Sequence, residues 1–187
     1  MEPRLSTDLR GGMLHQDCIQ MDPGLFVRAL CKSAEAYEAA MTFGEVVGIA
    51  RQGSQISAVR LADGSTIACD TVVLAAGAWS GLVLERWLGI SMPIGPLPQQ
   101  KLHLSLDGPP LGCAVRWLGA NIVQRLDGLI HLGSKPDDTG FNAATTSEGK
   151  EWLLERVRTV LPSLQFQVSE SAAGCAASTP DKIPIIG

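Results

Sequence analysis

The sequence lacks several features that would place it in a familiar class. It has no run of about 18 apolar residues, so we expect no membrane span. Its first twelve residues contain four charged side chains and no apolar stretch, which is not the pattern of a signal peptide. Lysine and arginine number 15 against 19 aspartates and glutamates, and the resulting net charge of -4 argues against nucleic-acid binding.

The cysteines are widely spaced, odd in number and never arranged as a CxxC pair. A disulfide framework and a zinc site are therefore not expected. Neither the five cysteines nor the three histidines form a cluster with metal-ligand spacing, and we predict no metal. The thiols are best explained as buried side chains of a cytoplasmic protein.

What the sequence does contain is 45% hydrophobic residues, enough to bury a core. Asp22-Pro23 is typical of a helix N-terminus, and apolar residues recur at helical spacing to about Ala40. Three short runs follow, with an Asp63-Gly64 turn before the last of them. They predict an antiparallel meander over residues 46–50, 55–61 and 67–68.

A continuous apolar run over 71–76 predicts a strand buried on both faces. A helix is expected over 79–88. Three prolines then mark a linker or domain crossing, at Pro93, Pro96 and Pro98. The first lobe is therefore expected to cover residues 21–90.

Beyond the prolines, four short β-like runs predict an antiparallel sheet, over residues 101–106, 113–117, 121–125 and 129–133. A helix over 147–161 follows, with Thr145 and Glu148 as a capping box and Pro162 as its stop. A further strand is expected over 165–172. We expect a second lobe over 91–175 together with 1–20, and a return of 176–187 to the first lobe.

Four segments, in this order and spacing, resemble the D-amino-acid oxidase/glycine oxidase family of FAD-dependent oxidoreductases. Each is weak alone, but their order and spacing extend across nearly all 187 residues: the segments are 2–30, 63–80, 125–141 and 179–187. The resemblance implies an α+β or α/β fold, with a partial FAD-binding, Rossmann-like lobe over 21–90 and an antiparallel-sheet substrate lobe of the D-amino-acid oxidase type over 91–175.

The same resemblance implies a cofactor site. It places Ala75, Ala76 and Gly77 beside the adenosine–pyrophosphate part of FAD, with Trp79 just after them, and Val46 on a strand that meets the adenine. Small residues at a strand end also let another backbone or a ligand approach closely. A packed strand end and an ordinary core tryptophan explain the same residues without a cofactor.

Two departures from the family pattern bear on function. No GxGxxG turn, which would bind the pyrophosphate at a helix N-terminus, occurs in the sequence. Ala176 stands where the family has an arginine for the substrate carboxylate. Nor do His103, His131 or Arg125 have an evident catalytic partner. We expect a truncated chain that is inactive by itself.

Two functional hypotheses therefore stand. The first is an FAD-dependent amine or amino-acid oxidase, similar to glycine oxidase, with a small amine or amino acid as substrate of a complete relative. The alternative is a non-enzymatic interaction or binding module derived from that scaffold. A buried strand left without its neighbours would favour a homo-oligomer.

Overall fold

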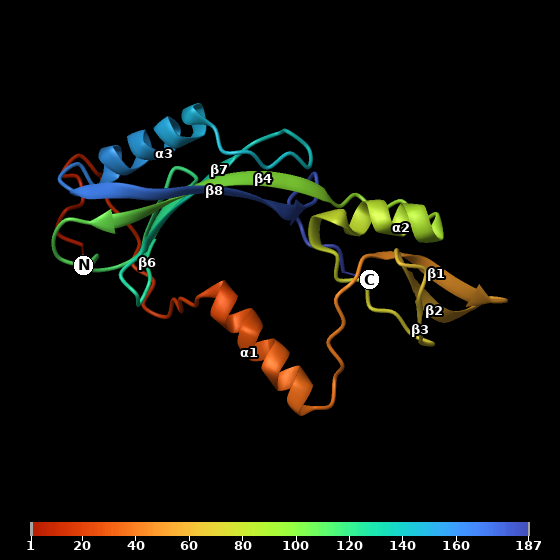
Figure 1. The fold of residues 1–187 in the computed structure, drawn as a ribbon. Coiled ribbons are helices and arrows are strands. Elements are labelled where there is room, and N and C mark those ends of the chain that lie inside the picture. Colours follow the sequence, from red (N-terminus) through yellow and green to blue (C-terminus); the bar gives the residue numbers. More distant parts are fainter. Residues whose placement is uncertain (1, 187) are drawn as a thin grey trace. The chain divides into compact units, whose positions relative to one another are not determined.

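A computed structural model describes residues 2–186, which divide into two compact units. The first unit contains residues 2–22 and 96–176, and the second contains residues 23–95 and 177–186. Each unit is therefore built from two stretches of chain. The elements of both are labelled in Figure 1.

The first unit is built on a five-stranded sheet with the order β5-β6-β7-β4-β8. The pairs β5–β6, β6–β7 and β4–β7 are antiparallel, which confirms the antiparallel sheet predicted from the sequence. One helix, α3, lies over one face of this sheet (Figure 1). The elements are β4 (Gly95–Leu106), β5 (Val115–Trp117), β6 (Ala120–Gln124), β7 (Ile130–Pro136), α3 (Ser147–Val160) and β8 (Phe166–Ser178).

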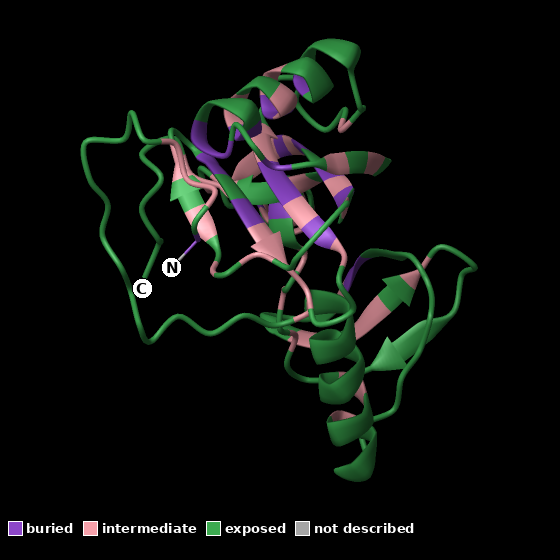
Figure 2. Cartoon of the chain, turned by 90° about the vertical axis from the view of Figure 1, so that its left-hand side faces the viewer, coloured by how far each residue is buried: buried purple, intermediate pink, exposed green. Residues whose placement is uncertain are grey.

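The core lies between α3 and the sheet. Alternate residues of β4 and β7, among them Leu102 and Leu132, are fully buried, and they form one cluster with Leu153 and Val157 from α3. The purple buried segments of Figure 2 gather at this interface. Strand alternation and helical spacing therefore direct one face of each element to the same core.

A buried glutamine joins α3 to the sheet. The side-chain oxygen of Gln100 accepts hydrogen bonds from the backbone N–H of Thr146 (3.0 Å) and its hydroxyl (3.3 Å). Its amide nitrogen donates to the carbonyl of Thr146 (3.0 Å) and to Oγ of Ser171 (3.1 Å). The predicted capping box of Thr145 and Glu148 was wrong, because Thr146 is the N-cap and accepts from the backbone N–H of Gly149.

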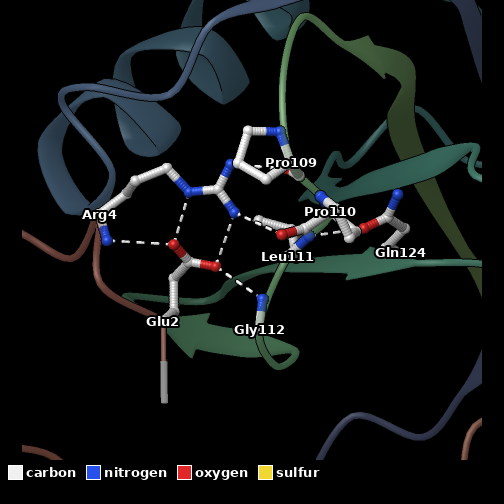
Figure 3. Close-up of polar contacts among 7 residues, drawn as sticks. All are labelled: Glu2, Arg4, Pro109, Pro110, Leu111, Gly112 and Gln124. Carbon is white, nitrogen blue, oxygen red and sulfur yellow. Dashed lines mark hydrogen bonds and ion pairs between the residues drawn. The ribbon is translucent and has the colours of Figure 1, made fainter.

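A buried ion pair ties the N-terminal segment to the same unit (Figure 3). The carboxylate of Glu2 contacts Nε of Arg4 at 2.6 Å and accepts a hydrogen bond from the backbone N–H of Gly112. The guanidinium of Arg4 donates to the carbonyls of Pro109 and Pro110, at 2.9 and 2.8 Å. These contacts hold the segment that begins at residue 2 to the loop between β4 and β5.

The second unit contains two helices, a 3-10 turn and a three-stranded antiparallel sheet of order β1-β2-β3, which confirms the predicted meander. Its elements are α1 (Pro23–Ala36), β1 (Val46–Gln52), β2 (Gln55–Leu61), β3 (Thr66–Ala68), η1 (Gly77–Trp79) and α2 (Ser80–Leu88). The first helix ends four residues before the predicted Ala40, close to Glu38, whose φ of 66° is incompatible with continuing a right-handed helix.

The predicted buried strand over 71–76 was wrong. Residues 71–76 adopt no regular structure, and the side chain of Val73 is 87% exposed. Among residues 2–186 no strand pairs with this segment. Apolar β-formers need a neighbouring strand to satisfy their backbone groups, so the local pattern alone is not sufficient.

Two strands are longer than the sequence indicated. The strand β4 includes Pro96 and Pro98, which were assigned to a linker; both precede Gln99, where pairing with β7 begins, so neither removes a donor from that ladder. The strand β8 runs to Ser178 and not to residue 172. Among the described residues, no helix is long and apolar enough to cross a membrane.

Candidate functional site

All five residues predicted to contact FAD belong to the second unit. Val46 is the first residue of β1, opposite Leu61, and is 38% exposed. Ala75 and Ala76 follow the irregular 71–74 segment, and Gly77 begins η1. The structure therefore places the Ala75–Gly77 segment at the entry to a helix and not at the end of a strand.

The entry to this helix leaves backbone accessible. Gly77 has a φ of +54°, and a Cβ built there would meet nothing within 4 Å. Trp79 is the N-cap of α2, makes no side-chain capping hydrogen bond and is 50% exposed. Its backbone N–H donates to the carbonyl of Ala76. The turn from Ala76 to Trp79 thus presents main chain and an aromatic ring on the surface of its unit.

A polar cluster lies in the first unit, on the sheet face opposite α3. His103 and His131 are cross-strand partners in β4 and β7, with ring centroids 4.4 Å apart. Nδ1 of His103 lies 2.8 Å from a carboxylate oxygen of Glu170, on β8. Its Nε2 is buried and makes no hydrogen bond to the described residues. No local sequence pattern points to this pairing, because the two histidines are 28 positions apart.

The two cationic side chains near this cluster, Arg125 and Lys101, differ in their ion pairing and exposure. The Arg125 guanidinium forms ion pairs with Asp22 and with Asp127 (2.9 Å), which makes it a structural residue of the β6–β7 turn. Lys101, opposite Gly133 in the β4–β7 ladder, is exposed. Ala176 lies on β8 and offers no donor for a carboxylate.

The environment of His131 keeps its ring neutral at pH 7. Burial lowers the pKa of His131 below its ordinary 6.5, and the positive charges of Lys101 and Arg125 and the neighbouring His103 lower it further, against a smaller opposing effect of Asp22. Because the unfolded chain binds this proton more tightly than the folded chain, protonation of His131 lowers the free energy of unfolding as the pH falls below 6.5.

We expect an NMR titration of the His131 ring to give a midpoint below pH 6.5. The Lys101→Met variant should raise that midpoint, because it removes a positive charge that opposes protonation. Lys135→Met is a matched control, since Lys135 lies on β7, the strand of His131, but is paired with Asp137 (3.5 Å). A midpoint at or above 6.5 in the unmodified chain would contradict this assignment.

Comparison with known proteins decides the family. The family model described as FAD dependent oxidoreductase matches residues 1–187. The chain belongs to this family.

Within residues 2–186, no group of three or more His, Cys, Asp or Glu side chains could hold a metal ion.

The curated relatives of this chain are longer proteins. It is 33% identical over 144 residues to glycine oxidase from Pseudomonas putida, a match that covers 76% of this chain and 39% of the relative. It is 29% identical over its whole length to a hydrogen cyanide synthase subunit from Pseudomonas aeruginosa, of which it covers 45%. The chain thus spans less than half the length of these relatives.

Solved structures show the same fold. The iminodiacetate oxidase from Chelativorans sp. BNC1 superposes with a TM-score of 0.77 at 21% identity, over 88% of this chain and 45% of that one. Glycine oxidase from Bacillus cereus gives a TM-score of 0.73 at 22% identity, over 86% and 45%. These neighbours confirm the predicted mixed fold of the D-amino-acid oxidase type.

The residues present fit part of an FAD site. The accessible turn from Ala76 to Trp79 suits a ligand that contacts main chain and stacks on an aromatic ring. The phosphate-binding GxGxxG turn is not in the sequence, and the basic residue of the nearby helix α2 is Arg86, in its last turn. The described residues therefore suit the adenosine part of FAD better than its charged pyrophosphate.

Proposed function

We propose that this chain forms part of an FAD-dependent oxidoreductase of the glycine oxidase or amino-acid oxidase type. The observation that carries the proposal is the family match over residues 1–187, together with 33% identity to a glycine oxidase. In such a reaction FAD supplies the hydride acceptor, and the protein binds and orients the substrate and excludes water.

The second unit contributes the cofactor contacts in this proposal. Val46 would contact the adenine, and Ala75, Ala76 and Gly77 would hold the adenosine–pyrophosphate region. Trp79 follows them at the start of α2. The accessible backbone at Gly77 supports this assignment, because its Cβ position is open. These residues bind by close approach and stacking, since their side chains carry no charge.

The first unit contributes the substrate side, and the substrate is a small amine or amino acid. The polar face that holds His103, His131 and Lys101 supports this role. Neutral His131 can accept a hydrogen bond from an amine nitrogen. Ala176 leaves no arginine for a carboxylate at its position, so recognition of a carboxylate would need another donor.

The 187-residue chain alone should not bind FAD tightly. With no GxGxxG turn and a net charge of -4, we expect a dissociation constant above about 1 μM, because the helix N-terminus that compensates the pyrophosphate charge is missing. Flavin fluorescence during an FAD titration measures the constant. Peroxide release with glycine, sarcosine and D-alanine should stay at background, and Ala176→Arg alone should not restore it. Sub-micromolar binding would contradict this expectation.

A chimera tests the site itself. The chain's matching residues would replace the homologous 144 residues of the Pseudomonas putida glycine oxidase. We expect the chimera to purify with FAD and Gly77→Val to release it. Gly53→Val is the matched control, because Gly53 also has a positive φ (65°) but lies in the β1–β2 turn. Equal flavin loss in both variants would indicate a general loss of folding and reject the site. A colourless chimera that remains folded would favour the interaction module.

A further inference from the structure

Four residues form one row across the five-stranded sheet, on the face opposite α3. In the β4–β7 ladder Lys101 lies opposite Gly133, and in the β6–β7 ladder Asn121 lies opposite the same glycine. Arg116 continues the row on β5, opposite Asn121. Directly opposed residues direct their side chains to the same face of a sheet. It is also the face of His131, which lies two positions before Gly133 on β7.

The glycine in this row lets the side chains of its two neighbours approach each other. A Cβ built at Gly133 would lie 3.3 Å from Cβ of Lys101 and 3.8 Å from Oδ1 of Asn121. These two residues stand on either side of β7, so their Cα atoms are roughly 10 Å apart, about twice the usual strand spacing. Their side chains can therefore reach one small molecule that lies above Gly133.

The Lys101 ammonium has no acidic partner among residues 2–186. It is exposed and takes part in none of the ion pairs there. Arg125, in contrast, is paired with Asp22 and Asp127. The positive charge of Lys101 acts on His131, because it helps to lower the pKa of that ring. An uncompensated cation and a neutral imidazole thus lie near each other on one face.

This combination of groups suits a molecule with both a carboxylate and an amino group. The Lys101 ammonium compensates a negative charge and donates hydrogen bonds, and the side-chain amide of Asn121 offers a further N–H donor. Neutral His131 offers an acceptor for an amino group. A small α-amino acid carries both groups on one carbon atom, whereas a simple amine would engage His131 alone.

We propose that Lys101, assisted by Asn121, binds the carboxylate of a small amino acid on this face of the sheet, while His131 accepts a hydrogen bond from its amino group. Lys101 is then the residue that distinguishes an amino acid from an amine without a carboxylate. It supplies the donor that Ala176 does not. The proposal rests on the proposed oxidoreductase function and deepens it, but its test requires neither FAD nor turnover.

An NMR titration of the full 187-residue chain with glycine tests the proposal. The titration is made at pH 7 and low ionic strength, where charges are least screened. We expect glycine to shift the backbone amide signal of Gly133 and the ring signals of His131. Methylamine, which has no carboxylate, should bind about tenfold more weakly than glycine. Lys101→Met should weaken glycine binding about tenfold, because it removes a charge-assisted hydrogen bond.

Two further variants separate a local role of Lys101 from general electrostatics. Lys135→Met removes the same charge on the α3 side of the sheet, where Lys135 lies 3.8 Å from a carboxylate oxygen of Glu148, and it should bind glycine like the parent. Lys101→Met/Asn121→Lys returns the positive charge to the row from β6 and should recover most of the glycine binding. Circular dichroism checks that each variant is folded.

Four results would overturn the proposal. One is the absence of any shift at Gly133 or His131 up to about 0.1 M glycine. Others are a Lys101→Met variant that binds glycine like the parent, or equal weakening by Lys135→Met. The last is a loss in Arg116→Met without one in Lys101→Met, which would assign the carboxylate to the β5 end of the row.

This experiment can fail or succeed separately from the test of the oxidoreductase function. A chimera without FAD, together with Lys101-dependent glycine binding by this chain, would reject the oxidoreductase function and keep the amino-acid site. A chimera that holds FAD, together with glycine binding that does not depend on Lys101, would reject the amino-acid site alone.

Discussion

The Gly149→Ala variant should destabilise the first unit by about 3 kcal/mol. A Cβ at position 149 would lie 2.1 Å from Oε1 of Gln100 and 3.0 Å from Oγ1 of Thr146. Both atoms belong to the hydrogen-bond network that fixes the start of α3, so the methyl group would break buried bonds. The sign is informative, because Gly→Ala inside a helix normally stabilises by about 1 kcal/mol. Urea unfolding followed by circular dichroism measures the change.

The neighbouring Lys150→Ala substitution is the matched control, since Lys150 is exposed in the same helical turn and should change stability by less than about 0.5 kcal/mol. The double variant Gln100→Ala/Gly149→Ala should recover part of the loss, because the atom that meets the new methyl group is gone. A Gly149→Ala protein as stable as the parent would show that Gln100 can move aside at little cost.

The Glu2→Gln variant should lower the free energy of unfolding at pH 7 by about 3 kcal/mol. The pKa of Glu2 is lowered from 4.5 to about 2 in the folded protein, and each pH unit of this shift corresponds to about 1.4 kcal/mol. The hydrogen bond from Arg4 is the largest cause, and the backbone N–H of Gly112 adds to it. A lowered pKa means that the stabilisation is complete above pH 4.5 and disappears as the pH falls toward 2. The measurement is urea unfolding of both proteins across this range.

The difference between the two proteins should shrink steadily between pH 4.5 and 2, whatever else acid does to the fold. Glu148→Gln serves as control, because the Glu148 side chain is 86% exposed and its ion pair with Lys135 is long, at 3.8 Å. That variant should match the parent within about 0.5 kcal/mol. A pH-independent difference for Glu2→Gln would assign the loss to packing and not to charge.

Elements with a strong local signal could be predicted from the sequence. The helix over 147–161 was found within one residue of its observed end, because Pro162 cannot continue it and Leu153 and Val157 recur at helical spacing. The β1–β2–β3 meander was found from alternation and the Asp63-Gly64 turn. The family, and with it the fold class, was found from four segments read together.

What the sequence could not give depends on contacts between distant residues. The 71–76 segment has the composition of a buried strand, but pairing depends on which neighbours lie beside it. The Gln100 network joins residues that are 46 and 71 positions apart, so no local pattern points to it. Nothing in the local sequence marks Gly149, although the space for its Cβ is already filled.

The two units alternate along the chain, and this order limits when the contacts of each can form during translation. Residues 2–22 leave the ribosome before their partners in the first unit, which begin at residue 96. Arg4 must wait for Pro109 and Pro110, 105 and 106 positions later, while residues 23–95 can already begin to compact. Residues 2–22 therefore stay without these partners on the nascent chain until residues 109 and 110 have been made, and we expect this non-local capture to slow the folding of the first unit.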